Sequence, residues 1–240
     1  MNGPGRLTGL PPGCPAFIVL FALLLLIPFF FARLMLAAVA QLGLPSDLAL
    51  LALFGIFLGG AVNIPVKRVE RHEELPVQPL ALYGFGRILP RLGFEPAGGG
   101  PYRTYTTIAV NLGGCVIPVA LAVYEVVRIV GRGPATIGIA AGIAALDVLA
   151  CYRLARPMPN VGIAMPALVP PVIAAVPSLL LVPDFAPPVA FVAGVLGPLV
   201  GADVLHLREI RTVPTGVASI GGAGTFDGIV LSGMIAALLA

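Results

Sequence analysis

Residues 186–207 read APPVAFVAGVLGPLVGADVLHL, an apolar run in which Asp203 is the one acidic residue and Lys and Arg are missing. A helix needs about 20 apolar residues to cross the hydrocarbon layer of a bilayer, and this run is long enough. A carboxylate inside such a run is costly and rare, and it usually faces a cavity or marks a functional pathway. This stretch therefore predicts a membrane-spanning helix that carries a candidate functional residue.

Six further apolar stretches approach the same length: 16–42, 47–65, 104–127, 134–152, 161–182 and 214–240. The chain is 58% hydrophobic and 10% charged, whereas soluble domains contain about 25% charged residues. The stretches lack the alternation of barrel strands, and backbone groups in lipid must be satisfied within the segment. We predict an all-α polytopic helical bundle of about seven spans that forms a single integral membrane domain, residues 1–240.

The basic residues predict the orientation of the bundle. With a cytoplasmic N-terminus, eleven of the fourteen Lys and Arg residues fall on the cytoplasmic side, as the positive-inside rule requires, while Arg128 and Arg132 fall outside. We expect an integral protein of the plasma membrane, with the bilayer as its main partner. The net charge of +3 is explained by these loops and calls for no nucleic-acid partner.

The first stretch has a second interpretation, because Arg6 and the apolar run before Ala38-Val39-Ala40 resemble a cleaved secretory leader. The length of the run favours a span. Between the second and third stretches, residues 66–103 are rich in charge, Pro and Gly, and we expect a cytoplasmic loop or cap insertion there. Residues 80–92, with Arg87 and Arg91 four apart, predict a short interfacial helix or hairpin, and a plain solvated loop fits equally well.

Two of the predicted spans are interrupted. Residues 158–171 contain four prolines, which cannot lie in an unbroken helix, and residues 214–226 are rich in glycine. We expect broken or re-entrant segments there, since irregular backbone at membrane depth survives where protein or water covers it. For Gly224 and Gly228, close packing of small residues is the alternative.

The polar residues of the apolar stretches fall at similar predicted depths, in the cytoplasmic half. Asp147, Asp203 and Asp227 lie there. The expected cleft is lined by Asn63, Asn111, Pro166, Ala167, Leu168, Gly221, Gly222, Gly224 and Thr225. The sequence therefore predicts a water-accessible cavity that opens toward the cytoplasm.

Two carboxylates that share a site can activate water, one as base and one as acid, because proximity drives their pKa values apart. Asp203 and Asp227 lie on consecutive spans and form the best candidate pair, with Asp147 as a reserve member. Such a pair needs no cofactor. The expected activity is an intramembrane hydrolase, and the expected substrates are peptides within the membrane.

Two sets of motifs resemble known families. The glycine-rich segment before Asp227 and the Pro166-Ala167-Leu168 segment resemble motifs of presenilin-type intramembrane aspartyl proteases, although Pro-Ala-Leu precedes the aspartates here rather than following them. That resemblance implies an aspartyl protease in which these segments shape the cleft. Residues 111–118, 197–207 and 219–228 are similar to a domain-of-unknown-function family of prokaryotic multi-span membrane proteins, which implies no mechanism.

Three other interpretations remain open. Asp203 and His206 share a helical face and could bind a divalent metal with a third carboxylate, while the alternative for His206 is a place in the headgroup region. Broken helices and lone carboxylates are also typical of a proton- or metal-ion-coupled transporter or channel. A non-catalytic membrane scaffold is the third interpretation. In the transport interpretation, a homo-oligomer would form the pathway.

Overall fold

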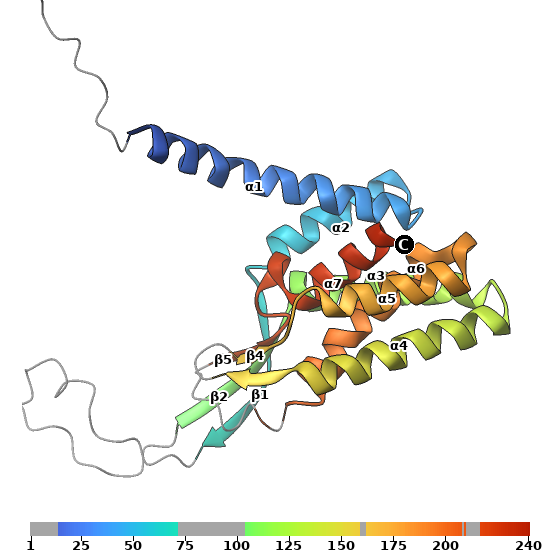
Figure 1. Ribbon diagram of the computed structural model, residues 1–240. Coiled ribbons are helices and arrows are strands. Elements are labelled where there is room, and N and C mark those ends of the chain that lie inside the picture. Colours follow the sequence, from blue (N-terminus) through green and yellow to red (C-terminus); the bar gives the residue numbers. More distant parts are fainter. Residues whose placement is uncertain (1–13, 72–103, 159–161, 208, 210–216) are drawn as a thin grey trace, which may run out of the picture.

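The computed structural model describes residues 14–71, 104–158, 162–207, 209 and 217–240 (Figure 1). Its helices are α1 (Cys14–Gln41), α2 (Ser46–Gly59), α3 (Ile117–Val130), α4 (Pro134–Leu154), α5 (Val169–Leu181), α6 (Ala186–Leu196) and α7 (Gly228–Leu239). The π-helical segment η4 (Leu112–Val116) leads into α3, and the π-helical segment η6 (Gly197–Val204) continues α6. Two short 3₁₀ turns, η5 (Pro183–Phe185) and η8 (Gly224–Phe226), precede α6 and α7.

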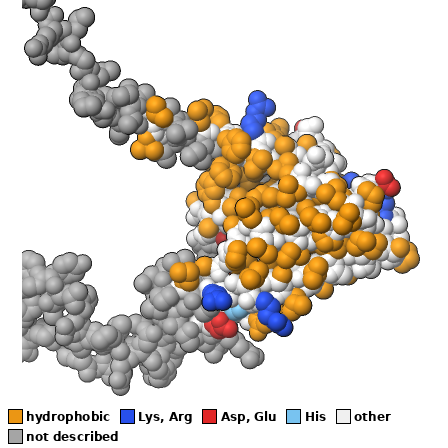
Figure 2. Space-filling view, in the orientation of Figure 1, with side chains coloured by type: hydrophobic (Ala, Val, Ile, Leu, Met, Phe, Trp, Pro, Cys, Tyr) orange, Lys and Arg blue, Asp and Glu red, His pale blue; other side chains and the backbone are white. Residues whose placement is uncertain are grey.

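Three helical segments are long and apolar enough to cross a membrane: Leu112–Val130, Pro134–Leu154 and Pro183–Val204. Phe29–Gln41, Ser46–Gly59, Val169–Leu181 and Gly228–Leu239 are shorter apolar helices. Figure 2 shows apolar side chains over the visible face of the helices, with charged side chains at its margins. A helical bundle of membrane-protein character is therefore observed, while the number of spans stays a prediction.

The segment α6–η6 is the central helix of the bundle. In the span Pro183–Val204, 78% of the most apolar window is buried, against 22% for Pro134–Leu154. Small side chains at Ala186, Ala190 and Ala193 are fully buried. They allow neighbouring backbones to approach closely, which stabilises helix packing in lipid. The helix that carries Asp203 is thus enclosed by its neighbours, while α4 exposes most of its surface.

The strands lie together beyond one end of the bundle, which we call the sheet end (Figure 1). The turns α1–α2, α3–α4 and α5–α6 lie at the opposite end, which we call the loop end. The main sheet has the order β1 (Asn63–Arg71), β2 (Thr104–Asn111) and β5 (Val217–Ile220). Strands β1 and β2 are antiparallel, β2 and β5 are parallel, and β3 (Arg156–Met158) pairs with β4 (Gly162–Ala164).

This sheet shows that the all-α prediction was wrong in part. The apolar stretches 47–65 and 104–127 each combine a helix with a strand, since α2 ends at Gly59 and η4 begins at Leu112. The reason is that a short apolar run fits a buried strand as well as a helix, and the β-branched residues of 104–111 favour the strand. Asn111 therefore ends a strand and does not lie two turns inside a helix.

The predicted interruptions are observed in the residues that the structure describes. Residues 165–168 are non-helical between β4 and α5, and β5, a turn and η8 precede α7. Of the predicted cap at 66–103, β1 and β2 form the two flanks as an antiparallel pair. The prediction of a helix or hairpin at 80–92 lies outside the described residues.

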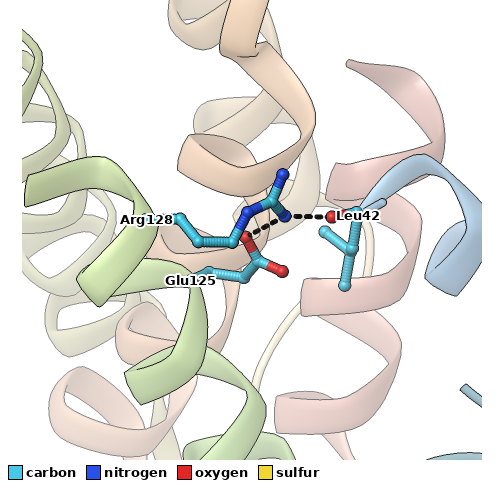
Figure 3. A network of polar contacts seen from close by, with 3 residues as sticks. All are labelled: Leu42, Glu125 and Arg128. Carbon is cyan, nitrogen blue, oxygen red and sulfur yellow. Dashed lines mark hydrogen bonds and ion pairs between the residues drawn. The ribbon is translucent and has the colours of Figure 1, made fainter. Parts of the chain in front are cut away.

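At the loop end, a polar network joins α3 to the α1–α2 turn (Figure 3). Glu125 is fully buried, and its Oε2 accepts a hydrogen bond from Arg128 Nη1 at 2.8 Å. The same Nη1 donates to the carbonyl oxygen of Leu42. The guanidinium groups of Arg128 and Arg132 lie 5.3 and 4.3 Å from the ring centroid of Phe185 in η5. Arg128 and Arg132, the two exceptions to the charge rule, thus help to hold the loop end together.

Candidate functional site

The candidate site lies at the sheet end, where η6, η4 and the start of α7 meet. Asp203 comes from the last turn of η6, and Asp227 is the residue before α7. Between them in space lies the glycine turn, residues 221–224, which follows β5. Both carboxylates are bound to backbone N–H groups of this turn.

The structure brings Asp203 and Asp227 together. Asp203 Oδ2 accepts a hydrogen bond from Gly221 N at 3.4 Å, and Asp227 Oδ2 accepts one from Ala223 N at 3.2 Å. The two carboxylates lie close enough for their charges to repel each other. Both side chains are half-buried. The predicted pair therefore shares one site, held by two N–H groups that lie two residues apart.

Asp227 is held more firmly than Asp203. Its Oδ1 accepts a hydrogen bond from Ile229 N at 3.0 Å, so that the residue also caps the N-terminus of α7. A carboxylate at this position satisfies a free N–H group and interacts favourably with the helix dipole. The sequence forms this cap locally, because Asp227 follows a turn and precedes an apolar helix.

The glycine turn needs glycine at two positions for close contact. Gly221 has φ of 70°, a conformation that other residues rarely adopt. A side chain at Gly114 in η4 would overlap the carbonyl oxygen of Gly221, and one at Gly224 would come within 2.9 Å of Gly60 Cα. The turn is thus pressed against η4 and the end of α2, which fixes the N–H groups that the carboxylates bind.

Asn111 and Asn63 hold the strands beside this turn. Asn111 is fully buried, and its Nδ2 donates to the carbonyl oxygen of Gly60 at 2.8 Å and to Asn63 Oδ1 at 3.0 Å. Its Oδ1 accepts from Gly114 N at 2.7 Å. Ser219 of β5 donates to Asn63 Oδ1 at 2.6 Å. The two asparagines that were predicted to line the cleft therefore connect β1, β2, β5 and η4 beside the glycine turn.

The other predicted cleft residues lie around the same place. Met165 Cε would touch a side chain placed on Gly228, so the non-helical segment with Pro166, Ala167 and Leu168 begins beside Asp227. These three residues are exposed. In the glycine turn Gly222 is exposed, whereas Gly224 and the following Thr225 are buried.

Asp147 lies apart from this pair, at the contact between α4 and η6. It is fully buried on α4, where Cys151 Sγ lies 3.8 Å from its Oδ1, and Oδ2 has no hydrogen-bond partner. A side chain at Gly197, the first residue of η6, would overlap Oδ2. The carboxyl group therefore packs against the beginning of η6, whereas Asp203 lies near its end.

His206 turns toward α4. Its Nδ1 lies 3.0 Å from the carbonyl oxygen of Gly201, its ring centroid lies 5.0 Å from that of Tyr152, and the side chain is buried. Within the part of the chain that the structure describes, no group of three or more His, Cys, Asp or Glu residues could hold a metal ion. The arrangement accounts for His206 as a packed side chain.

Cys115 is a site residue that the sequence did not single out. It is a buried free cysteine in η4 and lies within electrostatic reach of both Asp203 and Asp227. A side chain at Gly221 would come within 2.8 Å of its Cβ. The signal in the sequence was its place after Gly113-Gly114, which allow the close approach of η4 to the glycine turn.

Comparison with known proteins places the chain in a family. A comparison with curated proteins found no match, and a comparison with solved structures found no match either. One family model matches residues 57–239, a segment that contains Asp147, Asp203, Asp227 and both asparagines. This confirms the predicted membership of a domain-of-unknown-function family. The chain belongs to the family described as "Protein of unknown function (DUF1614)".

Proposed function

We propose that this protein is a membrane-embedded hydrolase of the aspartyl type, in which Asp203 and Asp227 activate a water molecule between them. One observation carries the proposal: both carboxylates bind the same glycine turn and lie close enough for their charges to interact. Two carboxyl groups that share a site divide into an acid and a base, because both cannot easily be ionised together. This division supplies both groups that hydrolysis needs.

The hydrogen bonds support a division of the two roles. Asp227 accepts N–H groups from Ala223 and Ile229, and both bonds stabilise its ionised form. Asp203 accepts one bond, at 3.4 Å, and faces the charge of Asp227. Asp227 is therefore the base that takes a proton from water, and Asp203 is the acid that protonates the leaving group.

The surroundings support a peptide substrate that is locally unfolded. The exposed residues 166–168 and the exposed side chain of Phe226 flank the pair, and neither segment is α-helical. A peptide bond within a helix is shielded by its own hydrogen bonds, so that a substrate must be extended at the site. The half-buried carboxylates are accessible enough to receive such a segment.

The test uses purified protein in detergent micelles with fluorescence-quenched peptides that correspond to membrane-spanning helices. Asp203→Asn and Asp227→Asn should each lower the cleavage rate by about 100-fold or more, because each removes one member of the acid/base pair. An Asn at 227 can still cap α7 through its side-chain oxygen. Unfolding midpoints close to that of the wild type will show that lost activity is not lost fold.

The matched control is Asp184→Asn, which changes an exposed carboxylate at the loop end and should leave cleavage unchanged. A photoreactive peptide with a hydroxyethylene group in place of the scissile amide provides a second measurement. It should label the wild type and not the two site variants. Cleavage or labelling that survives both substitutions would rule out the pair as the catalytic centre.

The second candidate function is proton- or metal-ion-coupled transport, and Asp147 favours its proton-coupled form. This carboxyl group lies in the bundle apart from the pair and has an oxygen without a hydrogen-bond partner. Intramembrane carboxylates of this kind commonly serve ion pathways. Proton or metal flux into proteoliposomes, lost in Asp147→Asn and kept in Asp203→Asn, would identify transport in place of hydrolysis.

A further inference from the structure

The carboxyl group of Asp147 is enclosed where α4 crosses η6. None of the side chain is exposed, and its Oδ2 has no hydrogen-bond partner. The neighbouring contacts are close: side chains at Gly197 and Gly201 would overlap Asp147 Oδ2 and the carbonyl oxygen of Val148. Gly197 thus leaves the space that the carboxyl group fills, and Gly201 allows the backbone of α4 to approach η6.

Among the residues that the structure describes, no positive charge is placed to balance an ionised Asp147. Helix α4 packs against η6, α6, α5 and α3. Neither α5 nor α6 contains a titratable residue, and η6 contains one, Asp203. The cations of α4 and α3 lie elsewhere: Arg153 is exposed near the end of α4, and Arg128 of α3 is bound at the loop end to Glu125 and Leu42.

The remaining titratable neighbours in the described part of the chain form no hydrogen bond with Asp147 Oδ2. The His206 ring lies against that of Tyr152, with centroids 5.0 Å apart, and His206 Nδ1 contacts the carbonyl oxygen of Gly201. The thiol of Cys151 is neutral or negative, never positive, and it lies 3.8 Å from Asp147 Oδ1. Glu125 and Tyr124 of α3 likewise carry no positive charge. A buried carboxylate that has only a thiol as donor and no counter-charge is very costly, and such a group takes up a proton instead.

We infer that Asp147 is a proton-binding site in the core of the bundle, and that α4 and η6 remain in contact only while the proton is bound. The occupant is a proton and not a metal ion, because a cation needs several oxygen ligands and Oδ2 contacts no polar partner. Loss of the proton leaves a charge that only water can solvate, which forces α4 away from η6. Since η6 also carries Asp203, this movement reaches the candidate site.

Two measurements test the site, and neither depends on the proposed hydrolysis. The first is infrared spectroscopy of the protein in detergent. A protonated carboxyl has a C=O stretching band that shifts when H₂O is replaced by D₂O. Subtraction of the Asp147→Asn spectrum from that of the wild type should isolate such a band at neutral pH, and the same band should persist in Asp203→Asn and Asp227→Asn.

The second measurement uses Cys151, a buried thiol on the same contact, as a reporter. Maleimide labelling, located by peptide mass spectrometry, should increase at Cys151 when the pH is raised in the wild type. In Asp147→Asn, which cannot ionise, Cys151 should remain protected at the same pH. The labelling rate of a free thiol, N-acetylcysteine, measured at each pH, corrects for the intrinsic effect of pH on thiol reactivity.

Two further variants keep the test decisive. Asp147→Ala serves if the Asn variant does not fold, because it removes the charge and adds no volume. Gly197→Ala should displace the carboxyl group and expose Cys151 at every pH. Absence of the difference band, or identical labelling of Cys151 in the wild type and in the neutral variants at high pH, would overturn the inference and leave the proposal for Asp203 and Asp227 untouched.

Discussion

At the scale of single residues, Asn111 joins four elements with one side chain. It ends β2, donates to Gly60 after α2 and to Asn63 of β1, and accepts from Gly114 of η4. The carbonyl group of Gly60 follows the end of α2, and the N–H group of Gly114 lies in the first turn of η4, where the regular hydrogen-bond pattern is incomplete. An amide suits this position because it offers both donors and an acceptor.

The first prediction concerns this residue. Asn111→Ala should lower the free energy of unfolding by about 2 kcal/mol or more, because Gly114 would keep an unsatisfied N–H group at a buried place and Gly60 an unsatisfied carbonyl group at a half-buried one. Asn63→Ala is the matched control, and it should cost about 1 kcal/mol or less, since Asn63 is exposed and water can replace it. Unfolding titrations in mixed micelles measure both. Equal losses would contradict the role of Asn111 as the buried link.

At the scale of elements, the π-helical segments place the aspartates. A π-helix is wider than an α-helix, is rare, and is often found at functional sites. The segment η6 carries Gly197 against Asp147 at one end and Asp203 against Gly221 at the other. The segment η4 presents Gly114 and Cys115 to the glycine turn. In both segments, a glycine lies at the close contact with a neighbouring element, and a polar side chain, Asp203 or Cys115, lies at the candidate site.

The second prediction tests whether this close approach is needed. Gly114→Ala should lower the free energy of unfolding by about 2 kcal/mol or more, since its methyl group would overlap the carbonyl oxygen of Gly221. Gly142→Ala on α4 is the control, because nothing lies within 4 Å of the position of its Cβ. It should be neutral or stabilise the helix by up to about 1 kcal/mol. The same titrations apply, and a neutral Gly114→Ala would show that η4 can move away from the turn.

At the scale of the whole molecule, charges separate between the two ends of the bundle. Lys67 and Arg68 of β1 and Arg153 and Arg156 around the end of α4 lie at the sheet end. Asp47 and Asp184 lie at the loop end, where Arg128 is bound to Glu125. The basic residues that the sequence predicted to be cytoplasmic, Lys67, Arg68, Arg153 and Arg156, therefore all lie at the sheet end. By the positive-inside rule, this arrangement predicts that the candidate site faces the cytoplasm.

The third prediction tests this orientation. A membrane-impermeant maleimide should label Asp184→Cys in intact cells, because the exposed position lies at the loop end. Lys67→Cys, exposed on β1, should be labelled only after the membrane is permeabilised. The wild type under the same conditions accounts for its own cysteines. The reverse pattern would place the sheet end and the aspartates on the outer side.

The sequence determined the membrane character, the interruptions and the choice of aspartates. Length and hydropathy are properties of the chain itself, so the apolar runs and the prolines at 158–171 identified helices and a break without knowledge of their neighbours. The same patterns could not distinguish the strand at 104–111 from a helix, because an apolar run of that length fits both.

Only the tertiary structure decided which polar residues meet. Asp203 and Asp227 come together because β5 pairs with β2 and leads the glycine turn to the end of η6, a contact between segments 18 residues apart. Asp147 shares their residue type and their predicted depth, yet it faces Gly197 at the other end of η6. The local sequence fixes the depth of a residue along its helix, whereas the packing of helices on one another fixes the neighbour it faces, because that depends on contacts distant in sequence.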